Sequence, residues 1–108
     1  MAFIKTLTLP SGASGNYTRL ITYRWDRTTK EALALFALYS SKDFATQGKP
    51  PFTQFIAKLR LERAKFDQYL SNDALTNADV LAQLYLAAKT EPVISDFGPD
   101  VFWDAQEG

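Results

Sequence analysis

The sequence contains no histidine and no cysteine. Without histidine, the chain lacks the side chain that most often acts as a general acid or base near neutral pH. Without cysteine, it has no thiol nucleophile, and the ordinary ligands of a zinc site are missing. A disulfide is excluded as well, which fits a reducing compartment such as the cytoplasm. We therefore predict a protein that is not an enzyme and that needs no cofactor.

Long hydrophobic runs are also missing, since no apolar stretch approaches the roughly 18–20 residues that span a bilayer. The first residues, from Met1 to Lys5, turn polar too early for the apolar part of a signal peptide. We expect a soluble protein with no membrane partner.

The carboxylates do not form a familiar metal site. Asp96, Asp100 and Asp104 recur at every fourth position, but a glycine and a proline lie between them and make a regular helix doubtful. A calcium loop needs ligands at closer spacing and a terminal glutamate. We predict no metal site.

What the chain does contain is enough apolar mass for one domain. It has 108 residues, of which 46% are hydrophobic and 14% are aromatic. This length is typical of a single domain that folds without a disulfide or a metal. We assign residues 1–92 to one domain. Residues 93–108 form an acidic, aromatic C-terminal segment that packs either on this domain or on a partner.

Alternating apolar and polar residues predict strands over residues 3–9, 17–25 and 52–61. In the second of these, the residues expected to share the inward face are Tyr17, Ile21, Tyr23 and Trp25. A helical stripe follows later in the chain at Val80, Leu81, Leu84, Tyr85 and Ala88. The expected fold is α+β, with a small antiparallel sheet of about four strands and one C-terminal amphipathic helix packed on it.

Residues 31–40 have two interpretations. Alanine and leucine favour a helix, and Thr28 with Glu31 forms a capping-box pattern. A strand in the same place would instead complete a hairpin with the preceding strand and lie at the centre of the sheet. Periodicity does not separate the two.

The net charge is zero, but the charges are unevenly distributed. Residues 1–65 carry eleven bases and four acids, whereas residues 66–108 carry one base and eight acids. The overall balance argues against a nucleic-acid partner, which normally selects a basic domain. The two charged parts either neutralise each other within the fold or meet between copies in a head-to-tail assembly.

These patterns indicate two candidate partner-binding surfaces. The first is a basic row in which Lys58 and Arg60 share the solvent face of a strand and Arg63 follows. The second is the C-terminal segment, whose candidate contact residues are Phe97, Phe102, Trp103 and Asp104.

Two stretches of the chain resemble a known family when their order is considered. Residues 9–17 read LPSGASGNY, and residues 38–42 read LYSSK and are followed by GKP at 48–50. This order is similar to that of small structural proteins of tailed bacteriophages, usually encoded among tail genes, and the similarity covers roughly the first 60 residues. The resemblance implies that residues 31–40 form a strand, and it carries no catalytic residues.

The resemblance also implies a function and a place. The chain would be a virion protein in or near the tail or baseplate, assembled in the host cytoplasm, with its own copies or other phage structural proteins as partners. The alternative is a small phage-encoded regulator or inhibitor that binds a bacterial host protein.

Overall fold

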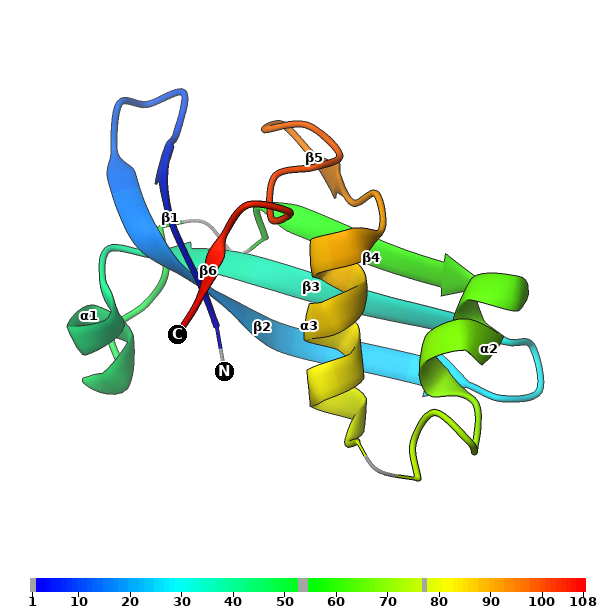
Figure 1. Cartoon of the computed structure of the whole chain (residues 1–108). Coiled ribbons are helices and arrows are strands. Elements are labelled where there is room, and N and C mark those ends of the chain that lie inside the picture. Colours follow the sequence, from blue (N-terminus) through cyan, green and yellow to red (C-terminus); the bar gives the residue numbers. More distant parts are fainter. Residues whose placement is uncertain (1, 53–54, 77) are drawn as a thin grey trace.

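The computed structural model describes residues 2–52, 55–76 and 78–108. These residues form an α+β domain in which one antiparallel sheet carries helices, as the sequence predicts (Figure 1). The strands are β1 (Phe3–Thr8), β2 (Ser14–Asp26), β3 (Glu31–Tyr39), β4 (Ala57–Glu62), β5 (Ile94–Ser95) and β6 (Gln106–Glu107). The helices are α1 (Lys42–Thr46), α2 (Ala64–Leu70) and α3 (Val80–Thr90).

Over the described residues, the sheet has six strands in the order β5-β4-β3-β2-β1-β6, not about four, and three helices accompany it, not one. The two additional strands lie at the two edges of the sheet, come from the C-terminal segment and contain two residues each. Strands this short have no periodicity to detect. Helices α1 and α2 are short as well, and the buried residues of α2, Phe66, Tyr69 and Leu70, cover only about one turn, which is too little to indicate a helix by periodicity.

The ambiguous segment forms the strand β3 and not a helix. It lies between β2 and β4 and pairs with both along its length. Phe36, Ala37 and Leu38 are each 0% exposed, so successive residues are buried on both faces. A central strand of this kind reads as a continuous apolar run, which explains why it looked helical. The predicted strand over residues 52–61 is shorter in the structure, and residues 53–54 lie outside the described part.

The inward face predicted for β2 is confirmed for Tyr23 and Trp25, which lie on the core side of the sheet, but it is wrong for Tyr17 and Ile21. Its pairing with β3 shifts by one residue between Leu20 and Thr22, so Ile21 forms a bulge. A bulge reverses which residues face each side, and Tyr17 consequently lies on the opposite side of the sheet from Trp25. Ile21 is 39% exposed, whereas the polar Thr18 is 2% exposed and faces the main core.

Helices α2 and α3 and the C-terminal segment cover the same side of the sheet, which we call the helical face (Figure 1). The largest fully buried aromatic side chains of this core are Phe3, Phe36 and Phe102. Asp79 caps the start of helix α3, and its carboxylate accepts a hydrogen bond from the Ala82 N–H at 2.7 Å. Within the described ranges, none of the helices is long and apolar enough to cross a bilayer.

Candidate protein-binding surface

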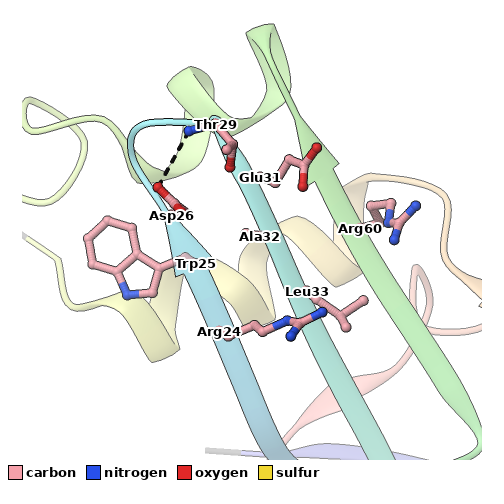
Figure 2. Close-up of a pocket in the computed structure, with 8 residues that line it drawn as sticks. All are labelled: Arg24, Trp25, Asp26, Thr29, Glu31, Ala32, Leu33 and Arg60. Atoms are coloured by element: carbon pink, nitrogen blue, oxygen red, sulfur yellow. Dashed lines mark hydrogen bonds between the residues drawn. The ribbon is translucent and has the colours of Figure 1, made fainter.

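Among the described residues, those that cover the side of the sheet opposite α3 lie at one end of it. There α1 packs over Tyr17, with Ala2 and Ala45 buried beside it. Over the other half of this side, no helix covers the sheet in the part of the chain that the structure describes (Figure 2). We call this uncovered area the open face and define it by the residues Thr22, Arg24, Leu33, Leu35, Lys58 and Arg60.

The open face is built from two rows that cross three strands. In one row, Leu33 of β3 lies between Arg24 of β2 and Arg60 of β4. In the other row, Leu35 lies between Thr22 and Lys58. Both leucines are half-buried, although they belong to the central strand. The result is an apolar centre with cationic side chains on both sides.

Strict alternation explains why these side chains point away from the core. In β4, Leu59 and Leu61 are 0% and 1% exposed and face the helices, whereas Lys58 and Arg60 are exposed. The sequence correctly places Lys58 and Arg60 on one solvent face; their role in partner binding stays a prediction. Arg63 lies beyond the end of β4, where its backbone N–H donates to the Lys30 carbonyl at 3.0 Å, so it does not continue their row.

A hollow of about 360 Å³ lies at the end of the open face near the β2–β3 turn. Figure 2 shows Arg24, Leu33 and Arg60 on three neighbouring strands, with α3 behind the sheet. The carboxylate of Asp26 is committed to the turn, since it accepts hydrogen bonds from the backbone N–H groups of Thr28 at 2.8 Å and Thr29 at 3.4 Å. Among the described residues, no group of acidic side chains is placed to hold a metal ion.

The cations of the open face are only weakly neutralised. Arg60 Nη1 lies 3.6 Å from Glu62 Oε1, and both side chains are more than half exposed. Exposed pairs of this kind contribute about 0–1 kcal/mol. Arg24 and Lys58 take part in none of the ion pairs found among the described residues. The face therefore offers positive charge to a partner.

Elsewhere, three ion pairs join the basic part of the chain to the acidic part. They are Lys5–Asp104, Lys30–Asp67 and Lys65–Glu91. The uneven charge distribution is thus neutralised within the fold at these points, but not on the open face. Neutralisation within the fold is therefore confirmed at these three pairs, and assembly between copies stays a prediction.

The C-terminal segment packs on its own domain. Phe102 is 0% exposed and stacks on Phe3, with ring centroids 4.6 Å apart. Phe97 is half-buried and packs against the same core. Phe102 is therefore not available to a partner, which corrects its place among the candidate contact residues. Its apolar side chain completes the core that the sheet alone leaves open.

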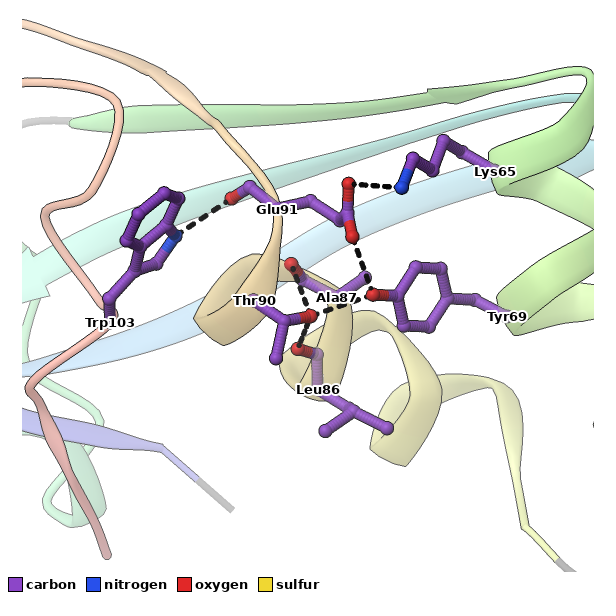
Figure 3. Close-up of polar contacts among 7 residues, drawn as sticks. All are labelled: Lys65, Tyr69, Leu86, Ala87, Thr90, Glu91 and Trp103. Carbon is purple, nitrogen blue, oxygen red and sulfur yellow. Dashed lines mark hydrogen bonds and ion pairs between the residues drawn. The ribbon is translucent and has the colours of Figure 1, made fainter.

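Trp103 and Asp104 stay at the surface but have contacts within the chain. Trp103 is 46% exposed, and its Nε1–H donates to the Glu91 carbonyl at 3.1 Å (Figure 3). Asp104 Oδ1 accepts from Lys5 Nζ at 2.7 Å, and this bond lowers the pKa of the Asp104 carboxyl. Both residues are exposed enough to touch a partner, but their contacts already explain why they are held in place.

Glu91 connects this segment to α2. Its carboxylate lies 3.0 Å from Lys65 Nζ and accepts a hydrogen bond from the Tyr69 hydroxyl at 2.8 Å (Figure 3). The bond from Lys65 is the main cause of the lowered pKa of Glu91, and the bond from Tyr69 adds to it. Burial raises the pKa of Tyr69. The cluster holds the end of α3 against α2 and the C-terminal segment.

Sequence reasoning missed Arg24, Leu33 and Leu35. The sequence does contain a pattern that indicates such a surface. Residues 31–39 are apolar on both faces of the predicted strand, but the sequence predicts one long helix, and one helix covers one side of a sheet. The apolar residues on the other side of that strand then face solvent or a partner wherever no short element such as α1 covers them. Comparisons with known protein families, with curated proteins and with solved structures find no match to the chain.

Proposed function

We propose that this chain is a non-enzymatic assembly protein that docks another protein on its open face. The observation that carries the proposal is the pair Leu33 and Leu35, half-exposed at the centre of the sheet between cations. Each Å² of apolar surface removed from water contributes about 25 cal/mol. Protein interfaces commonly combine such an apolar centre with a polar rim.

The charged rim defines the kind of partner. Arg24, Lys58 and Arg60 surround the leucines and are exposed. Complementary charge steers association and suppresses wrong partners. The partner surface is therefore acidic around an apolar centre.

The proposed setting is the particle of a tailed phage, in or near its tail or baseplate. This part of the proposal is supported by the resemblance of residues 9–17 and 38–50 to small phage structural proteins. The open face supplies such a protein with a surface for contacts to other virion proteins or to further copies of itself. Assembly in the host cytoplasm and a final location in the virion follow from this setting.

The test has two parts. Mass spectrometry of purified particles should detect the chain in particles and not only in infected cells. Replacing Leu33→Thr or Arg60→Glu should then reduce the amount incorporated, while the thermal unfolding temperature changes little. Lys42→Glu is the matched control, because Lys42 is exposed on α1, away from the open face.

Either part can contradict the proposal. A chain found only in infected cells would remove the virion setting and favour a regulator that binds a host protein. Normal incorporation of folded Leu33→Thr and Arg60→Glu variants would show that the open face is not the docking surface.

A further inference from the structure

One edge of the sheet is bare over half of the strand β2. β1 pairs only with Ser14–Thr18 of this strand, whereas β3 pairs with it as far as Asp26. Residues 22–26 consequently have a strand on one side only, as far as the described residues show. Alternate residues of such an edge direct their N–H and C=O groups outward, where another strand can pair with them.

Helix α3 extends past this edge (Figure 1). The Tyr85 hydroxyl accepts a hydrogen bond from the Leu20 N–H at 2.7 Å, which places the middle of α3 over β2. Leu81 lies one turn earlier on the same side of the helix as Leu84 and Tyr85. Leu84 and Tyr85 are 1% and 6% exposed, but Leu81 is 43% exposed.

The exposure of Leu81 has a geometric cause. Its side chain belongs to the stripe that packs on the sheet, but the sheet ends before the helix does. One additional strand beside β2 would lie under Leu81 and extend the core. The unpaired backbone edge of β2 and the exposed Leu81 are independent features. One added strand would pair with the edge and also cover Leu81.

The side chains along the edge define the chemistry of that strand. Tyr23 pairs with the core residue Ala34, so it lies on the helical face, and it is 41% exposed. Arg24 lies on the open face and takes part in no ion pair among the described residues. An added strand would therefore place apolar residues next to Tyr23 and acidic residues next to Arg24.

We propose that the edge formed by residues 22–26 binds an extended segment of a partner protein with alternating apolar and acidic residues, which adds a strand to the sheet. This inference rests on the proposed function, because it names how the partner of the open face is held. A second copy fits less well in the register centred on Arg24, because antiparallel pairing of two β2 edges then places the two Arg24 side chains opposite each other, and like charges opposite each other destabilise a sheet.

The experiment is a titration of the ¹⁵N-labelled protein with a synthetic seven-residue peptide of alternating valine and glutamate. Two further peptides carry backbone N-methyl groups, on the valines only or on the glutamates only. Amide shift changes and slowed amide exchange should concentrate at residues 22–26 and the first turn of α3. In an added strand, alternate N–H groups point to the same side, so one methylated form should bind at least about tenfold more weakly and the other nearly as well as the parent.

Protein variants test the two features separately. Arg24→Glu should raise the Kd by roughly tenfold, since a favourable cross-strand pair becomes a pair of like charges. Leu81→Ala should also weaken binding. Leu86→Ala is its matched control, because Leu86 is 46% exposed on the same helix but lies away from the sheet-facing stripe. Thermal unfolding should show that all three variants are folded. If Arg24→Glu does not fold, the comparison of Leu81→Ala with Leu86→Ala still tests the inference.

Three results would overturn the inference. Equal binding of both methylated peptides would exclude strand addition, and an absence of binding at millimolar peptide would exclude this class of segment. Shift changes confined to Leu33, Leu35 and Lys58 would place the peptide on the open face and leave the proposed function standing. Loss of the proposed function itself would be seen in the particle experiment and not in this titration.

Discussion

The packing of Phe102 leads to a prediction that separates a core residue from a partner-binding residue. Its ring is 0% exposed, stacks on Phe3 with centroids 4.6 Å apart, and lies 5.3 Å from the ring of Phe36. Phe102→Ala should therefore destabilise the isolated protein, with no partner present.

The magnitude follows from the burial. Phenylalanine-to-alanine changes in a core cost about 3–5 kcal/mol, because the lost transfer free energy is joined by the cost of a cavity. Small domains have a total stability of about 5–15 kcal/mol, so the loss is a large fraction of it. At about 4 °C or more per kcal/mol, the unfolding temperature should fall by at least about 12 °C.

Urea and thermal denaturation followed by far-UV circular dichroism measure this loss. Trp103→Ala is the control, because Trp103 is the next residue, is 46% exposed and contributes one hydrogen bond to the Glu91 carbonyl. It should cost less than Phe102→Ala, because about half of the Trp103 side chain stays in water in the folded protein. The reasoning would be refuted if Phe102→Ala cost less than about 1 kcal/mol, or if the two variants lost equal stability.

Three further predictions concern single contacts. Tyr85→Phe removes the acceptor of the Leu20 N–H and should cost about 1–3 kcal/mol, with faster hydrogen exchange of the Leu20 amide; unchanged exchange would contradict it. Glu91→Gln should lower the unfolding temperature at pH 7, because the lowered pKa of the Glu91 carboxyl adds stability at pH values above its ordinary pKa of 4.5. The difference in unfolding temperature from the wild type should shrink as the pH falls through the lowered pKa of Glu91, and a difference that persists in acid would count against this. Gly15→Ala should cost about 1–3 kcal/mol in urea unfolding, since an added Cβ collides with a backbone carbonyl of β3, and a variant as stable as the wild type would show that the strands can separate without cost.

The fold was predictable where one residue pattern determines one structure. Leu59 and Leu61 alternate with exposed bases in β4, and Leu84 and Ala88 form the buried stripe of α3, as their spacing predicts. In β3, local propensity alone favoured a helix as strongly as a strand. The segment forms a strand because it pairs with two neighbouring strands and is buried on both faces. Both are tertiary effects that local propensity does not contain.

The bulge at Ile21 could not be predicted, because alternation continues through it in the sequence while the pairing shifts in the structure. The exposure of Leu81 was hidden for a similar reason, since it depends on where β1 stops pairing with β2. The open face could not be predicted without the order of the strands, because only that order places Arg24 and Arg60 on either side of Leu33. Candidate residues could thus be found one strand at a time, but not the surface they form together.

The stacking of Phe3 on Phe102 has a consequence for synthesis of the chain on the ribosome. Phe3 emerges long before its aromatic partner Phe102, because the two residues are far apart along the chain. Until then, this part of the sheet exposes apolar surface that has no cover, and such surface promotes aggregation. The nascent chain can form the β2–β3 hairpin before Phe102 is made, but this part of the core closes only after Phe102 has emerged. Contacts between residues so distant along the chain also slow folding, because the cost of closing the long loop comes before the contact is made.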